Sequence, residues 1–173
     1  MHIAVVSAPE RGQTDKLLAH LAADLMACGT RVVGVVQTNI ERPESRHCDM
    51  DLRVLPAGPV LRISQNLGTA SRGCRLNAEA LETAVAAVER GLAEGADLLV
   101  VNRFGKHEAE GRGFRDLIAT ALVAGIPVIC GISSRNRSAF DAFSDGVETA
   151  ELHDSEQAMI WLGVVSEKLS AAG

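Results

Sequence analysis

The chain has 173 residues, of which 47% are hydrophobic and 23% are charged, so a disordered protein is excluded and one compact domain over residues 1–173 is expected. Its 17 Lys and Arg against 22 Asp and Glu give a formal net charge of −5, which argues against a nucleic-acid-binding protein, because such proteins need a basic face. The longest apolar runs, around Leu98–Val101 and Ala124–Ile132, are far shorter than the ~20 residues of a membrane span, and no signal-peptide pattern opens the sequence, so we expect a cytoplasmic protein.

The first residues predict a strand, a helix and a second strand. His2–Val6 and Arg31–Gln37 are short apolar runs rich in β-branched residues, which is typical of buried strands. Between them, apolar residues at helical spacing predict a helix that Thr14 caps and that ends near Gly29. The polar segment Asn39–Arg46, which contains a proline, is expected to be a loop.

A β-hairpin is predicted next, as an insertion over about residues 48–65. Its expected strands are Asp51–Leu55 and Val60–Ser64, and the residues between them, Pro56-Ala57-Gly58-Pro59, have the chemistry of a turn. A second polar loop, Asn66–Arg75, is expected to follow.

The rest of the chain alternates helices with apolar strands. We expect helices at Asn77–Leu92, Phe114–Val123, Ser138–Phe143 and Glu156–Leu169, and strands at Leu98–Val101 and Val128–Ile132. Fully apolar strands that alternate with helices are typical of a parallel sheet covered on both faces. The sequence therefore predicts an α/β fold of three layers, with a parallel sheet and a β-hairpin insertion.

The turn after the first strand matches half of a phosphate-binding loop, which is written G-x-x-x-x-G-K-[ST]. At that spacing Gly12 and Thr14 match the second glycine and the hydroxyl that binds Mg²⁺. Ser7 replaces the first glycine and Gln13 replaces the lysine, whose lost charge costs about 10- to 150-fold in phosphate affinity. Backbone amides at the start of a helix still attract anions, and Arg11 can restore some positive charge. The alternative is an ordinary strand–helix turn.

The strand Leu98–Val101 ends in Asn102 and Arg103, where a nucleotide hydrolase normally carries a carboxylate that holds Mg²⁺ and a general base. Asn102 brings no negative charge for the metal, and Arg103 puts a cation where the base is expected. Together with Gln13, these two residues argue against Mg²⁺-dependent hydrolysis.

Residues 102–108, N-R-F-G-K-H-E, followed by Gly113-Phe114-Arg115, resemble the D-E-I-G-K-M-E…F-R segment of the THEP-type nucleoside-triphosphatases, small P-loop enzymes of the RecA-like class. This resemblance implies a P-loop NTPase-like fold and ATP or GTP with Mg²⁺ as ligands. It also implies that Lys106 and Glu108 are candidate catalytic residues. The residues on matching positions are Gly12, Thr14, Gly105, Lys106 and Glu108.

The sequence also resembles an uncharacterised bacterial family, some members of which carry the label molybdenum ABC-transporter ATP-binding protein. The shared motifs are C-D-M-D-L-R (Cys48–Arg53), R-I-S-Q-x-L-G (Arg62–Gly68), R-G-C-R-L (Arg72–Leu76) and N-x-F-G-K-x-E-A-E-G (Asn102–Gly111). This resemblance implies a link to molybdenum metabolism, with a transporter or metal-metabolism protein as a partner.

The segment from residue 31 to residue 75 carries seven arginines and four acidic residues, a local charge of 7 − 4 = +3. Such an asymmetry steers anions to one edge of an acidic molecule. Arg62, Arg72 and Arg75 are therefore candidates for binding an oxyanion such as phosphate or molybdate. The alternative is that these arginines are solvated loop residues.

The same loops contain His47, Cys48 and Cys74, which the hairpin could bring together. Two thiolates and an imidazole suit a transition metal. The alternative is that both thiols are small buried hydrophobic groups.

Three functions follow from these patterns. The leading hypothesis is a protein that binds a nucleotide or another small anion between Ser7–Thr14, Asn102–Lys106 and the Arg-rich loops, with little or no hydrolysis. The second is an active, atypical nucleoside-triphosphatase in which Arg11 or Lys106 replaces the missing lysine and Glu108 or Glu110 is the base. The third is a metal-handling module. A homo-oligomer is an additional hypothesis for the assembly.

Overall fold

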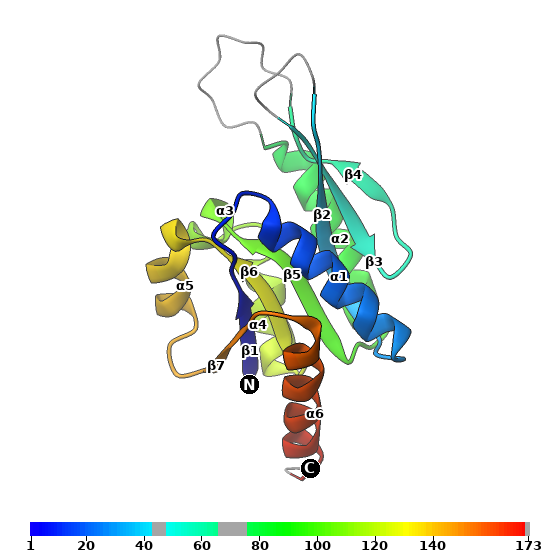
Figure 1. The fold of residues 1–173 in the computed structure, drawn as a ribbon, viewed down its shortest axis with the longest axis vertical. Helices are drawn as coiled ribbons and strands as arrows, with labels where there is room; N and C mark the ends of the chain where they lie inside the picture. The colour runs from blue at the N-terminus through cyan, green and yellow to red at the C-terminus, as the bar shows by residue number, and fades with distance from the viewer. Residues whose placement is uncertain (43–47, 66–75, 172–173) are drawn as a thin grey trace.

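A computed structural model describes residues 1–42, 48–65 and 76–171, which contain one sheet of seven strands in the order β4-β3-β2-β5-β6-β1-β7 (Figure 1). The strands are β1 (His2–Val6), β2 (Val32–Ile40), β3 (Asp49–Leu55), β4 (Val60–Arg62), β5 (Leu98–Phe104), β6 (Val128–Ile132) and β7 (Glu148–Leu152). The helices are α1 (Gln13–Ala27), α2 (Ala78–Ala93), α3 (Lys106–Ala109), α4 (Arg115–Val123), α5 (Arg137–Phe143) and α6 (Ser155–Ala171), with a 3-10 turn, η1, at Ser134–Asn136.

The sheet is parallel except at one edge. The strands β2, β5, β6, β1 and β7 lie side by side in that order and pair in parallel. At the β2 edge, β3 pairs antiparallel with β2, and β4 pairs antiparallel with β3. The antiparallel pair β3–β4 is the hairpin that the sequence predicts. The predicted α/β fold with a parallel sheet is therefore confirmed.

Helices cover both faces of the sheet, so the three predicted layers are present. In Figure 1, α1 and α6 lie in front of the sheet, and α2 and α4 lie behind it. Successive residues of β1 alternate between two cores: Ile3 and Val5 pack in the core with α2 and α4, and Ala4 and Val6 pack in the core with α1 and α6. No helix in the described part of the chain is both long and apolar enough to span a bilayer.

The sheet opens between β2 and β5, because these strands pair only at their amino-terminal ends, Val32–Gly34 opposite Leu98–Val100. From Gly34 to Ile40, β2 pairs with β3 on its other side. Gly34 has a φ of +136°, and a Cβ on it would lie 1.9 Å from the carbonyl oxygen of Val100. The carboxyl-terminal halves of β2 and β5 are therefore free of each other, which is where open α/β sheets bind ligands.

Two predicted strands are longer in the structure. β2 continues to Ile40 because its polar end pairs with β3, and β5 continues to Phe104, which pairs with Ile132 of β6. The pattern of the sequence does not predict α3, which is a single helical turn, or β7, an edge strand whose side chains are largely exposed.

The prediction that Thr14 caps α1 is wrong. Gly12 is the N-cap, with a φ of +78° and no side-chain cap, and Thr14 lies inside the helix. The Thr14 hydroxyl oxygen accepts a hydrogen bond from the Ala8 N–H at 3.0 Å instead, which holds the preceding turn against the helix.

We expect Gly34→Ala to lower the free energy of unfolding by about 2–4 kcal/mol, because the added Cβ would overlap Val100 in a backbone conformation that disfavours alanine. Urea denaturation measures the change. Gly163→Ala is the control, since Gly163 is an exposed residue of α6 with open space around it, and we expect it to stabilise the protein by about 0.5–1 kcal/mol. Equal effects of the two changes would contradict the close approach of β2 to β5.

Candidate functional site

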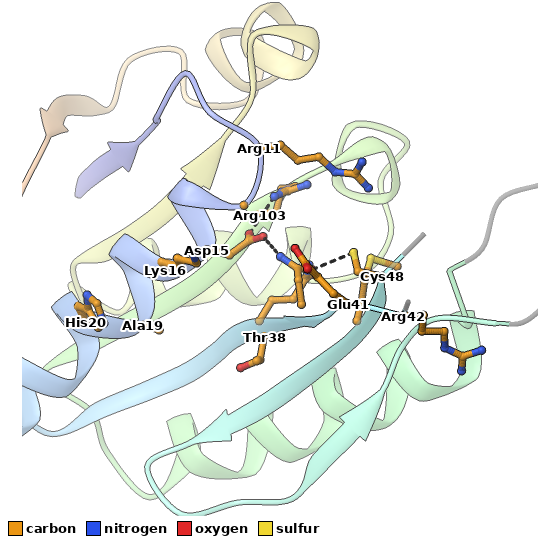
Figure 2. Close-up of a pocket in the computed structure, with 14 residues that line it drawn as sticks. Arg11, Asp15, Lys16, Ala19, His20, Thr38, Glu41, Arg42, Cys48 and Arg103 are labelled. Atoms are coloured by element: carbon orange, nitrogen blue, oxygen red, sulfur yellow. Dashed lines mark hydrogen bonds and ion pairs between the residues drawn. The ribbon is translucent and has the colours of Figure 1, made fainter. Parts of the chain in front are cut away.

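A cavity of about 690 Å³ lies between α1 and the carboxyl-terminal half of β2, beside the opening of the sheet (Figure 2). We name it the α1 cavity. Its charged lining residues, apart from His20, are Arg11, Asp15, Lys16, Glu41, Arg42 and Arg103. Among the described residues that line it, four cations against two carboxylates give an excess positive charge of 4 − 2 = +2.

The carboxylate of Asp15 is almost fully buried and is surrounded by donors. Asn39 Nδ2 donates to one oxygen at 2.6 Å, and Asn102 Nδ2 and Arg103 Nη2 donate to the other at 2.9 and 2.8 Å. The Asp15 side chain is 3% exposed and that of Arg103 is 44% exposed, so the guanidinium neutralises the buried charge from the solvent side. Figure 2 shows Arg103 and Asp15 meeting at the start of α1. We name Asp15, Asn39, Asn102 and Arg103 the Asp15 cluster.

The Asp15 cluster also bridges the opening of the sheet. Asn102, which is 2% exposed, accepts a hydrogen bond on Oδ1 from the backbone N–H of Gln37 at 2.8 Å. The Gln37 side chain in turn donates to Asn39 Oδ1 at 2.8 Å. Side chains therefore link β2 to β5 where the backbone ladder between them is missing, and no fully buried nitrogen or oxygen atom of these described side chains lacks a hydrogen-bond partner.

The structure separates the residues of the predicted phosphate-binding turn. Arg11 and Gly12 line the α1 cavity, whereas Ser7, Gln13 and Thr14 do not. Ser7, Arg11 and Gln13 are exposed, and Thr14 is buried. Two of the five residues predicted in this turn therefore line the α1 cavity, and the other three do not.

Lys106 lies apart from this turn. Its side chain is 81% exposed, its Nζ is 3.5 Å from Glu110 Oε1, and it lines a different cavity. Lys106 and Arg11, the two candidates to replace the missing lysine, therefore do not share a cavity.

Glu108 holds a turn of the backbone. It is 4% exposed, and its two carboxylate oxygens accept hydrogen bonds from the N–H of Gly105 at 2.8 Å and from the N–H of Phe114 at 3.1 Å. Gly113 packs so closely that a Cβ there would lie 2.3 Å from the Glu108 carboxylate. Both oxygens are thus engaged in fixing the segment that includes α3, and neither is directed at the α1 cavity.

Arg62, the hairpin arginine for which we predicted anion binding, is paired with acidic residues instead. Arg62 forms ion pairs with Asp49 at 2.7 Å and with Asp51 at 2.5 Å, and it does not line the α1 cavity. Arg72 and Arg75 lie outside the described residues, so their role stays a prediction.

The metal hypothesis rests mainly on residues outside the described part of the chain, since His47 and Cys74 are not among the residues described. Cys48 lines the α1 cavity, with its thiol 3.9 Å from Asn39 Oδ1. Within residues 1–42, 48–65 and 76–171, no group of three His, Cys, Asp or Glu side chains could hold a metal ion.

The sequence patterns do not identify Asp15 or Asn39 as site residues. Asp15 has the ordinary place of an acid in the first turn of a helix, and Asn39 falls in a predicted loop. The alternation of Gln37 and Asn39 was an available signal, because residues two apart on a strand share a face. The pairing of β2 with β3 extends β2 through Gln37 and Asn39, so that both side chains lie on one face of the strand.

The family described as "Protein of unknown function (DUF2478)" matches residues 3–161. The chain belongs to the DUF2478 family. A protein of Bradyrhizobium diazoefficiens, named molybdenum import ATP-binding protein ModC 2, is 34% identical to this DUF2478 chain over 167 residues, which are 96% of this chain. The chain spans only 19% of the length of that relative.

Solved structures resemble the DUF2478 chain over nearly its whole length. The crystal structure of THEP1 from the hyperthermophile Aquifex aeolicus has a TM-score of 0.59 and 18% identity, covering 99% of this chain and 98% of that one. The solution structure of a human cancer-related nucleoside triphosphatase has a TM-score of 0.55 and 16% identity, covering 99% and 96%. These likenesses confirm the predicted P-loop NTPase-like fold.

We expect Asp15→Ala to lower the free energy of unfolding by about 2–3 kcal/mol, because buried Asn102 and half-buried Asn39 lose their acceptor. Thermal or urea denaturation measures the loss. Asp116→Ala is the matched control, since Asp116 is an exposed acid in the first turn of α4, and its loss should cost less than about 1 kcal/mol. A cost for Asp15→Ala no larger than that of the control would contradict the hydrogen bonding of the cluster.

The lowered pKa of Asp49 predicts that the free energy of unfolding decreases in acid. Burial alone would raise the pKa of Asp49, but hydrogen bonds and charges from Arg42 and Arg62 hold it below its ordinary value of 3.8. The group therefore stabilises the fold above that value and stops doing so as the pH falls through the lowered pKa of the folded state.

In urea denaturation from about pH 5 down to about pH 3, wild-type stability should fall more steeply than that of Asp49→Asn. Glu79→Gln, in which an exposed acid of α2 is changed, should follow the wild-type slope. Equal slopes for Asp49→Asn and the wild type would show that Asp49 is not stabilised by the two arginines.

Proposed function

We propose that the chain binds a small oxyanion, either a nucleotide or an inorganic oxyanion, in the α1 cavity. The observation that carries the proposal is the excess positive charge of this cavity beside the start of a helix, since guanidinium, ammonium and helix N-termini all favour such anions. The side chains of Arg11 and Lys16 have no hydrogen bond or ion pair to any described residue, so both are available to a ligand. The P-loop NTPase-like fold and a relative named as an ATP-binding protein support a nucleotide.

The Asp15 cluster supports binding with little or no hydrolysis. Mg²⁺-dependent hydrolysis needs an available carboxylate for the metal and a group that positions the attacking water. Both oxygens of Asp15 are engaged, Arg103 is held beside it, and the Thr14 hydroxyl accepts the Ala8 N–H. These residues do not fit a Mg²⁺ ion, and we infer that a bound nucleotide is hydrolysed slowly or not at all.

We further infer that the anion binds without disrupting the Asp15 cluster. Withdrawing Arg103 would leave the buried carboxylate of Asp15 without its counter-charge, which is strongly unfavourable. Arg11 and Lys16 are exposed and can turn toward a ligand without such a cost. The anion should therefore contact these two side chains, together with the cavity-facing part of Arg103.

An active, atypical nucleoside-triphosphatase is the second candidate, favoured by the similarity to a nucleoside triphosphatase structure. Glu110 would then be the base, since Glu108 is engaged by backbone N–H groups. A phosphate-release assay with ATP or GTP and Mg²⁺ separates the two functions. Turnover that Glu110→Gln abolishes would establish the hydrolase and contradict our leading proposal.

A molybdenum-related role in the cytoplasm is the cellular setting that we propose. It is supported by the name of the Bradyrhizobium relative, of which this chain spans 19%. A transporter or metal-metabolism protein, or a second copy of the chain, is the corresponding proposed partner. Molybdate therefore belongs among the ligands to be tested.

We expect Arg11→Gln and Lys16→Gln each to weaken anion binding by about tenfold, because each removes one charge-assisted hydrogen bond. Calorimetric titration with ATP, GTP, phosphate and molybdate measures the affinity. Arg53→Gln is the matched control, since Arg53 is exposed on β3 and does not line the cavity. Equal weakening by the control would mean that overall charge attracts the anion, and no binding to the wild-type protein would refute the proposed function.

A further inference from the structure

A second cavity, of about 220 Å³, lies on the side of the sheet that α2 and α4 cover. We name it the apolar cavity. Its lining comes from both sheet and helix, and most of it is hydrocarbon. Its apolar lining residues include Val35, Leu52, Ile63, Leu76, Leu81 and Phe114. A hollow of this kind exposes apolar surface to water, and an apolar ligand group that fills it is stabilised by the surface that it buries.

Two cationic side chains, those of Arg103 and Lys106, line the apolar cavity. Among the described residues, the one acid that lines it is Glu108, and both of its oxygens are engaged by backbone N–H groups. The electrostatic environment therefore favours an apolar group that belongs to an anion over one that belongs to a cation.

The apolar cavity adjoins the α1 cavity. Gln37, Met50 and Arg103 line both of them. Gln37 lies on β2 and Arg103 on β5, the two strands beside the opening, and Met50 lies on β3, which pairs with β2. The opening thus brings a polar, positively charged compartment and an apolar compartment within reach of one ligand.

We propose that the ligand is an organic oxyanion with a ring-sized apolar group, and that this group binds in the apolar cavity while the oxyanion binds in the α1 cavity. This inference rests on the proposed function and specifies its ligand class. A cavity of about 150 Å³ is already enough for a benzene molecule, so about 220 Å³ accommodates a single ring. An inorganic oxyanion would use the α1 cavity alone and leave the apolar lining exposed.

Calorimetric titration of the wild-type protein with inorganic phosphate and with phenyl phosphate tests this inference, because the two probes differ by one ring. We expect phenyl phosphate to bind roughly 10- to 100-fold more tightly, since burial of a ring removes on the order of 100 Å² of apolar surface from water. Methyl NMR on the same samples should show shifts of Ile63, Leu76 and Leu81 with phenyl phosphate and not with phosphate.

Leu76→Glu places a carboxylate in the apolar cavity and should reduce the affinity for phenyl phosphate to that for phosphate. Leu61→Glu is the matched control, because Leu61 is also a part-buried leucine packed on the same core but lines neither cavity. The control should keep the preference for phenyl phosphate. If either variant fails to fold, the methyl shifts of the wild-type protein decide.

The outcomes separate the two claims. Equal affinity for both probes, or phenyl phosphate binding without shifts of the three methyl-bearing residues, would overturn the apolar-group inference and leave the proposed oxyanion site intact. Absence of binding by both probes would overturn the proposed function itself. A preference for phenyl phosphate that Leu76→Glu removes and Leu61→Glu retains supports both.

Discussion

A carboxylate buried in the first turn of α1 must be neutralised, and the way in which Asp15 is neutralised shapes the site. The charge sits where an uncompensated ion would strongly destabilise the fold, so Asn39, Asn102 and Arg103 all donate to it. These donors come from β2 and β5, the two strands that are unpaired at this level of the sheet. The carboxylate of Asp15 therefore connects β2 and β5 through side-chain hydrogen bonds, where backbone hydrogen bonds between the two strands are missing.

This arrangement redistributes the positive charge of the site. Arg103 is directed at Asp15, and Arg42 and Arg62 are directed at Asp49, so none of these three is fully available to a ligand. Arg11 and Lys16, which have no described partner, remain beside the cavity. In the site that we propose, two exposed cations therefore stand in place of the lysine of a phosphate-binding loop and of a metal-binding carboxylate.

Much of the fold could be predicted from the sequence, and the site only in part. Apolar runs such as Leu98–Val101 and the helical spacing of apolar residues in Asn77–Leu92 indicate which residues are buried. Burial of this kind follows from the order of apolar and polar residues along the chain, so the strand and the helix could be predicted. The cap of α1 could not be predicted in this way, because Thr14 competes with Gly12, whose left-handed backbone closes the turn without a side chain. The roles of Asp15 and Glu108 depend on partners from other segments, Asn39 and Asn102 for the one and the backbone of Phe114 for the other, and spacing along the chain does not encode such contacts.

The central claim is that the Asp15 cluster stays intact while Arg11 and Lys16 bind the anion. A crystal structure of the protein with inorganic phosphate bound tests it most directly. We predict phosphate oxygens within hydrogen-bond distance of Arg11 and Lys16, with Asn39, Asn102 and Arg103 still donating to Asp15. Phosphate that contacts neither Arg11 nor Lys16, with Arg103 turned away from Asp15, would contradict the account.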